Sequence, residues 1–120
     1  MAFNIERNDG FIEVHLWGEA QEGEVLTIVQ NLKEMAPKKE IADLWLISKE
    51  YVLPWASYLP IVEEIASFTP SNAVAMKSAI VVSDHFQMAQ AQLYLEAAKC
   101  LPFAVGAFMT RNEAIRWLAT

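Results

Sequence analysis

The stretch from Lys77 to Leu118 constrains the fold of this chain more than any other part of the sequence. It contains two short apolar segments, KSAIVVS and PFAVGAF, each followed by a segment of helical character, DHFQMAQAQLYLEAAKC and TRNEAIRWL. Asp84 and Thr110 stand where N-caps are expected, with Gln87 and Glu113 three residues later, which is the capping-box spacing. We therefore predict a βαβα unit with parallel strands and a right-handed connection.

The segments before residue 77 extend the same alternation. Asn8-Asp9-Gly10 separates two apolar runs, residues 2–6 and 11–17, and Asp-Gly between such runs is a strong hairpin signal. Periodic apolar positions predict helices over residues 24–36 and 58–68, and the continuous run 41–48 predicts a central strand. The order ββαβαβαβα predicts an α/β fold: a mixed, mainly parallel five-stranded sheet with four helices, in one domain over residues 1–120.

The second strand of the hairpin predicts how the sheet is covered. Its alternate positions give one aliphatic face and one mixed face, the latter including Glu13, His15 and Trp17. We therefore expect helices to cover one face of the sheet well and to leave the other partly open, with His15 as a half-exposed cross-strand residue. The two histidines have no accompanying Cys, His or Asp at ligand spacing, so we predict no metal site and no cofactor.

Composition restricts the class of partner. The net charge is −6 and the longest basic run is Lys38-Lys39, which argues against nucleic-acid binding because phosphate contacts require a basic surface. Hydrophobic residues make up 54% of the chain and include four tryptophans, more than a small core readily buries. Since large exposed apolar patches usually mark interfaces, we expect a homo-oligomer, most simply a homodimer.

Three further features concern location. The beginning of the chain lacks a basic region followed by an apolar run, so no signal peptide is predicted. No apolar run approaches the ~20 residues that span a bilayer. A single cysteine, Cys100, allows no internal disulfide, which fits a reducing, cytoplasmic setting, and we interpret it as a packing residue.

The end of the chain carries a family resemblance. Phe108 is followed by Glu113-Ala114-Ile115-Arg116-Trp117-Leu118, and this ending, together with the order of the elements, resembles the SpoIIAA-like group of the STAS superfamily. The resemblance covers the whole chain in element order but only about the last 15 residues in motif. It implies a bacterial protein with a mixed sheet packed by helices, and a role in binding proteins or small ligands. Trp117 and Leu118 are expected to close the core.

Some members of that family, the anti-sigma-factor antagonists, are switched by phosphorylation. They carry an Asp-Ser-Ser-Gly-like motif after the third strand, where a serine at a helix N-terminus accepts the phosphate. The matching region here, residues 48–57, lacks that motif, and Pro54-Trp55 stands near the place of the acceptor. Ser57 is a displaced candidate acceptor, but helix capping accounts for it equally well. The phospho-switch is therefore the least favoured alternative.

Candidate ligand-binding residues lie where strands are followed by helices. Ligands of open α/β sheets bind outside the carboxyl ends of the strands, and Asp84, His85 and Phe86 directly follow the fourth strand. Trp55, Ser57 and Tyr58 follow the third strand, so the two segments can form one aromatic cleft. The simpler interpretation makes Asp84 an N-cap and lets the aromatic rings bury a loop.

Three functions remain open at this point. The chain lacks a glycine-rich phosphate loop and a G-x-S-x-G elbow. We therefore favour a non-enzymatic module that binds itself, a protein partner or an apolar small ligand. The first alternative is a small enzyme or ligand sensor that uses Ser57, Asp84 and His85 around Trp55 and Tyr58. The second is the phospho-switched regulator described above.

Overall fold

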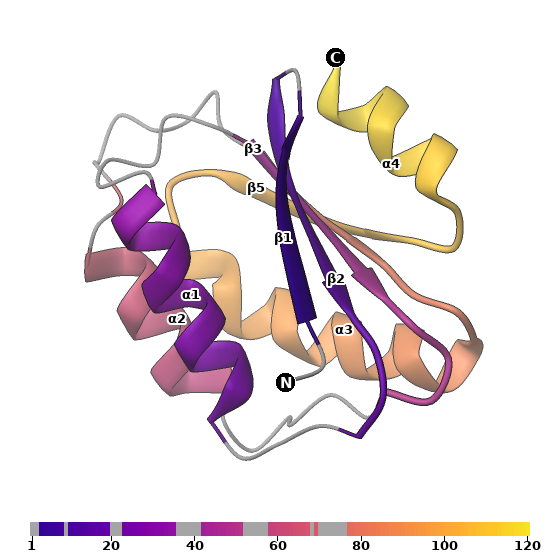
Figure 1. Cartoon of the computed structure of the whole chain (residues 1–120), viewed down its shortest axis with the longest axis horizontal. Helices are drawn as coiled ribbons and strands as arrows, with labels where there is room; N and C mark the ends of the chain where they lie inside the picture. The colour runs from indigo at the N-terminus through magenta and orange to yellow at the C-terminus, as the bar shows by residue number, and fades with distance from the viewer. Residues whose placement is uncertain are drawn as a thin grey trace.

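The structure is a computed structural model and describes residues 3–8, 10–19, 23–35, 42–51, 58–67, 69 and 77–120. Strands and helices follow the predicted order (Figure 1). The strands are β1 (Phe3–Asn8), β2 (Phe11–Leu16), β3 (Ala42–Ile47), β4 (Lys77–Val81) and β5 (Ala104–Phe108). The helices are α1 (Glu24–Met35), α2 (Tyr58–Ser67), α3 (His85–Ala97) and α4 (Arg111–Leu118).

The strands form one sheet in the order β1-β2-β3-β4-β5. The hairpin pair β1–β2 is antiparallel, and the other three pairs are parallel. Gly10 lies in the hairpin turn with φ of 85°, a left-handed conformation that glycine adopts without strain. The predicted α/β fold, with five strands in a mixed sheet and four helices, is therefore confirmed.

One face of the sheet is covered by α1, α2 and α3. The main core lies there, built from alternate strand residues such as Val14 and Leu16 and from helix residues such as Ile28 and Ala91. α2 packs beside α3, and Val62 joins Leu101 in a smaller cluster. Three helices therefore bury this face along its whole width, as the aliphatic face of β2 predicted.

Of the helices that the structure describes, only α4 lies on the other face (Figure 1). Ala114 of this helix packs against Leu44, Ala79 and Val81 of the central strands, and Trp117 packs beside them. Polar side chains of β1 and β2 lie on the same face, where Asn4 is paired with His15 and Glu6 with Glu13. The expectation of one covered face and one partly open face is confirmed.

One detail differs from the sequence prediction, and a second was not predicted. Cys100, expected to pack, is exposed in a 3-10 turn that follows α3, because the chain leaves the helical path there and Ala98 and Leu101 supply the buried contacts instead. In α3 one polar side chain is buried and one large apolar side chain is exposed: Gln87 is 2% exposed, whereas Phe86 is 65% exposed. No helix among the described residues has the length and apolar character that a membrane span requires.

Candidate functional site

A hollow of about 460 Å³ opens at the carboxyl ends of the parallel strands. Each of the three strands β2, β3 and β4 contributes the last residues of its path, and the loop after β5 adds one more. The lining residues are His15, Leu16, Trp17, Leu46, Ile47, Ser48, Val81, Val82, Ser83 and Met109. This is the edge of an open α/β sheet at which ligands generally bind.

The register of the sheet explains why these side chains meet. His15 is paired with Leu46, and Leu46 with Val81, so the three form a row across the face that α4 covers in part. Trp17 and Met109 stand at the rim and are 43% and 40% exposed. The hollow thus has an apolar floor, an aromatic rim and a few polar side chains, the usual composition of a small-molecule site.

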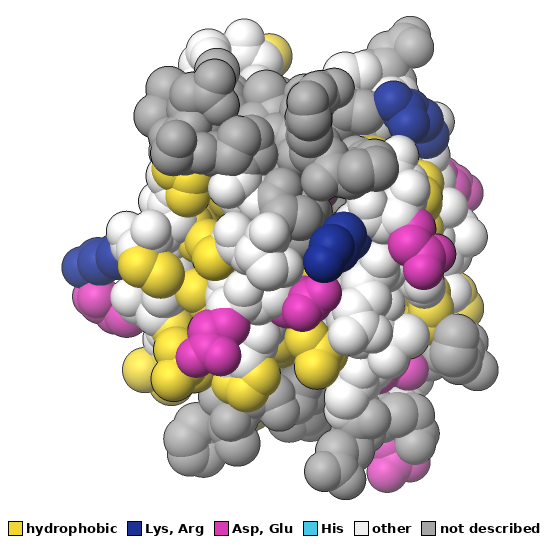
Figure 2. All heavy atoms as spheres, turned by 90° about the vertical axis from the view of Figure 1, so that its left-hand side faces the viewer, with side chains coloured by type: hydrophobic (Ala, Val, Ile, Leu, Met, Phe, Trp, Pro, Cys, Tyr) yellow, Lys and Arg dark blue, Asp and Glu magenta, His cyan; other side chains and the backbone are white. Residues whose placement is uncertain are grey.

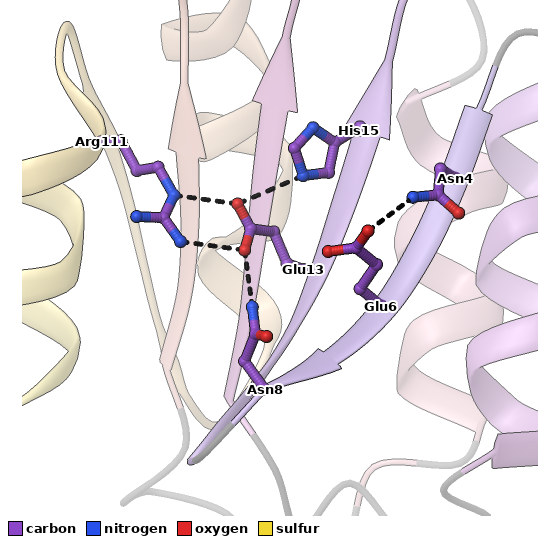
Figure 3. Close-up of polar contacts among 6 residues, drawn as sticks. All are labelled: Asn4, Glu6, Asn8, Glu13, His15 and Arg111. Carbon is purple, nitrogen blue, oxygen red and sulfur yellow. Dashed lines mark hydrogen bonds and ion pairs between the residues drawn. The ribbon is translucent and has the colours of Figure 1, made fainter.

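A polar network adjoins the hollow on the open half of the sheet and is centred on Glu13 (Figure 3). The Arg111 guanidinium donates from Nε to Glu13 Oε2 at 2.9 Å and from its second nitrogen to Oε1 at 3.0 Å. The Asn8 amide donates to Oε1 at 2.6 Å. His15 Nε2 lies 3.2 Å from Oε2. Three hydrogen bonds and one contact with a histidine nitrogen therefore surround a carboxylate whose side chain is only 4% exposed.

The electrostatic consequence is a stabilised negative charge. The hydrogen bonds from Arg111 hold the pKa of Glu13 below its usual range, although burial of the carboxyl opposes them. The same hydrogen bonds raise the pKa of Arg111. Because Arg111 is the first residue of α4, this pair also fixes the start of that helix over β2. Bidentate pairs of this kind are among the stronger polar contacts in proteins.

Glu6, Glu13 and His15 bring three potential metal-ligand atoms within 4.8 Å of one another. Both oxygens of Glu13, however, already accept hydrogen bonds from the positively charged Arg111. A divalent cation would have to share that carboxylate with a guanidinium at close range, which like-charge repulsion disfavours. The arrangement is that of an ion-pair network rather than a metal centre.

The loop that follows β3 is tied down by buried side chains. Gln87 of α3 donates from Nε2 to the carbonyls of Ser48 and Tyr51 at 2.7 and 2.9 Å, and its Oε1 accepts from the Ser83 amide at 2.7 Å. The Tyr51 hydroxyl donates to Glu24 Oε1 at 2.7 Å, and burial raises the pKa of this tyrosine. Two helices outside the hollow, α3 through Gln87 and α1 through Glu24, therefore hold its polar edge in place.

The structure separates the sequence-predicted site residues that it describes. Asp84 caps α3 by accepting a hydrogen bond from the Gln87 amide at 2.8 Å, so its predicted capping role is confirmed. His85 and Phe86 are exposed on the first turn of that helix. Tyr58 is buried between helices and donates its hydroxyl to the Gln90 carbonyl at 3.0 Å. None of these four lines the hollow; ligand binding by them stays a prediction.

Trp55 and Ser57 lie outside the described residues. The predicted cleft around Trp55, the acid–base alternative with Ser57 and the phosphorylation of Ser57 are therefore not tested. Their proposed partner Asp84 already uses one carboxylate oxygen to accept a hydrogen bond at the N-terminus of α3.

Comparisons with known proteins bear on the fold. No protein-family model matches the chain, and no curated protein matches it in sequence. A crystal structure of an uncharacterised protein of the DUF3478 family from Shewanella loihica PV-4, described as having a SpoIIAA-like fold, superimposes with a TM-score of 0.61. The match covers 98% of this chain and 92% of that chain. The fold is SpoIIAA-like. At 16% identity the likeness concerns the SpoIIAA-like fold alone.

The ion pair of Glu13 with Arg111, and the contact of His15 with it, are features of this region that the sequence does not predict. The sequence pattern places Glu13 and His15 on the mixed face of β2, but the partner of Glu13 lies 98 residues away. A single acidic residue between apolar neighbours on a strand, Glu13 in FIEVHL, is the signal that was present. Because buried carboxylates need a partner, an acidic residue in this position predicts that a positively charged side chain lies nearby, but it does not identify that residue.

Proposed function

We propose that this chain is a non-enzymatic binding module that holds a small, largely apolar ligand in the hollow at the carboxyl ends of β2, β3 and β4. The observation that carries the proposal is the hollow itself, about 460 Å³ in volume and lined by residues of three strand ends and Met109. Ligand pockets in proteins usually occupy roughly 300–1,000 Å³ and are mainly apolar with a few polar groups.

Two further features support it. The rim residues Trp17 and Met109 are large apolar side chains left 43% and 40% exposed, and a ligand between them would remove that surface from water. The edge of the site is also preorganised, because Gln87 fixes the adjoining loop and Arg111 fixes the start of α4. A site that is already ordered loses little conformational entropy when a ligand binds.

The test uses 2-methoxynaphthalene as an apolar probe and amide and methyl NMR shifts as the readout. We expect shift changes at Leu46, Val81 and Met109, and a loss of binding of at least fivefold in Trp17→Ala. The matched control is Phe86→Ala, another exposed aromatic that does not line the hollow. Shifts confined to α2 and α3, or equal effects of the two variants, would overturn the proposal.

A second candidate function is self-association through α2 and α3. Leu59 of α2 and Phe86 and Leu93 of α3 are 62%, 65% and 55% exposed, which is unusual for large apolar side chains. Figure 2 looks onto the side of the molecule that carries α1 and α2, and hydrophobic side chains gather in its lower left part. Light scattering after size exclusion tests this candidate: a dimer that Leu93→Glu converts to a monomer supports it, and a wild-type monomer at high concentration excludes it.

A further inference from the structure

We infer that the polar end of the ligand is a hydrogen-bond donor, so that the hollow selects an uncharged aromatic alcohol of the phenol class rather than a carboxylate. The inference rests on the proposed function and concerns the chemistry of the same site. It follows from two polar side chains that line the hollow, His15 and Ser83. The hydrogen of His15 points to Glu13 and that of Ser83 to the Ile47 carbonyl, so both side chains offer lone pairs to a ligand.

The first group is His15, whose ring nitrogens have different surroundings. Nε2 lies 3.2 Å from Glu13 Oε2, and an ionised carboxylate only accepts hydrogen bonds, so Nε2 carries the hydrogen. In a neutral imidazole the other nitrogen, Nδ1, is then an acceptor. Figure 3 shows this nitrogen on the side of the ring away from Glu13, toward the strand ends. Within the described residues Nδ1 has no hydrogen-bond partner, and the His15 side chain is 39% exposed.

A chain of contacts behind His15 fixes which of its two ring nitrogens carries the hydrogen. Glu13 cannot turn its carboxylate away from His15 because Arg111 holds both of its oxygens and Asn8 holds one of them. The low pKa of Glu13 keeps the carboxylate ionised at neutral pH. Arg111 therefore acts as a positioning residue, since it orients the group that fixes the proton on Nε2.

The second group is Ser83. Its hydroxyl donates to the Ile47 carbonyl at 2.9 Å, so its single hydrogen is used inside the protein and only lone pairs remain for a ligand. Two of the polar side chains that line the hollow thus present acceptors. A bound hydroxyl or aromatic N–H can donate its hydrogen to one of them, whereas an ether or a hydrocarbon can donate to neither.

The charges near the site disfavour an anionic ligand. Glu13 lies behind His15, and Glu50 accepts a hydrogen bond from the Gly18 amide at 3.2 Å, next to Trp17 at the rim. Hydrogen bonds from backbone amides lower the pKa of Glu50, so this carboxyl is ionised as well. A carboxylate ligand would meet the negative charge of Glu50 and the lone pair of Nδ1, whereas the charge of Glu13 is neutralised by Arg111. The apolar floor in turn disfavours a fully charged amine, because burying a charge without a counter-ion is costly.

The experiment compares 2-naphthol with its methyl ether, 2-methoxynaphthalene, and with 2-naphthoate, at pH 8. Histidine is ordinarily neutral at this pH. One added hydrogen bond predicts about five- to tenfold tighter binding of the alcohol than of the ether, with the naphthoate weakest. His15→Phe should bring the alcohol and the ether within twofold of each other, whereas His85→Phe, which changes the exposed histidine of α3, should preserve the preference.

A second measurement needs no variant. Long-range ¹⁵N NMR of the free protein at pH 8 should show the His15 hydrogen on Nε2 and a lone pair on Nδ1. A cationic ring, or hydrogen on Nδ1, would overturn the inference, as would equal affinity for the alcohol and the ether in the wild type. Equal, measurable affinities leave the binding function standing, whereas failure of every probe to bind removes that function too, so the two failures are distinguishable.

Discussion

Removal of the Arg111 guanidinium should destabilise the fold by more than an ordinary surface substitution. The side chain makes two charge-assisted hydrogen bonds to Glu13, at 2.9 and 3.0 Å, and Glu13 is almost fully buried. Bonds to charged groups contribute about 1.5–3 kcal/mol each. Because 46% of the Arg111 side chain is exposed, and because Asn8 and His15 still contact the carboxylate, we discount the sum to about 2 kcal/mol for Arg111→Ala.

Urea denaturation at pH 7, followed by tryptophan fluorescence, measures this difference in the free energy of unfolding. For a chain of this length the same change lowers Tm by roughly 8 °C. The control is Arg116→Ala, an exposed arginine of the same helix, for which about 0.3 kcal/mol is expected. A double-mutant cycle with Glu13→Gln isolates the pairwise contribution, which should reach about 1–2 kcal/mol.

Two results would refute this reasoning. The first is an Arg111→Ala variant no less stable than Arg116→Ala, which would mean that water replaces the guanidinium at no cost. The second is a coupling energy near zero in the double-mutant cycle. It would show that the two single losses arise from unrelated changes, such as fraying at the start of α4.

Three other predictions follow from named contacts. The difference in unfolding free energy between wild type and Arg111→Ala is expected to have its full size above pH 4.5, the ordinary pKa of Glu13. It should shrink as the pH falls through the lowered pKa of Glu13 in the folded state, and urea denaturation at pH values from 6 to 3 checks this sign. Gln87→Leu should lower the free energy of unfolding by about 3 kcal/mol, because several backbone groups would lose their hydrogen-bond partner. The exposed Gln92→Leu should be nearly neutral in the same denaturation assay. Gly106→Ala should cost about 1 kcal/mol and shift tryptophan fluorescence, since the added Cβ would lie 3.1 Å from the Phe108 ring and 3.3 Å from Trp117; unchanged spectra and stability would contradict it.

What the sequence predicts well is local. Element order follows from hydrophobic period and turn residues, and the N-caps Asp84 and Thr110 accept hydrogen bonds from Gln87 and Glu113 as their spacing predicted. These contacts join residues three apart, so they need no knowledge of the tertiary structure.

What the sequence does not predict depends on tertiary placement. The burial of Gln87 in α3 is one example, because its amide is satisfied only once loop carbonyls surround it. Those carbonyls belong to residues 36 to 39 positions earlier in the chain. The Glu13–Arg111 pair similarly requires α4 to lie across the sheet, which no periodicity shows. The hollow combines four separate strand ends, and its residues share no sequence motif.

The position of the hollow and of its polar neighbour follows from the unequal number of helices on the two faces. A helix is about 10 Å wide and strands are about 4.8 Å apart, so one helix covers roughly two or three strands. α4, with 8 residues, lies over β3, β4 and β5, and no other helix of the described ranges covers β1 or the polar half of β2 on this face. The buried carboxylate of Glu13 lies on that boundary, and the first residue of α4, Arg111, is placed to neutralise it. The side chain next to that carboxylate on the same face, two residues nearer the strand end, is His15, and there its imidazole meets both the network and the hollow. Binding chemistry is therefore expected at the margin of α4, where an apolar floor and an oriented polar group meet.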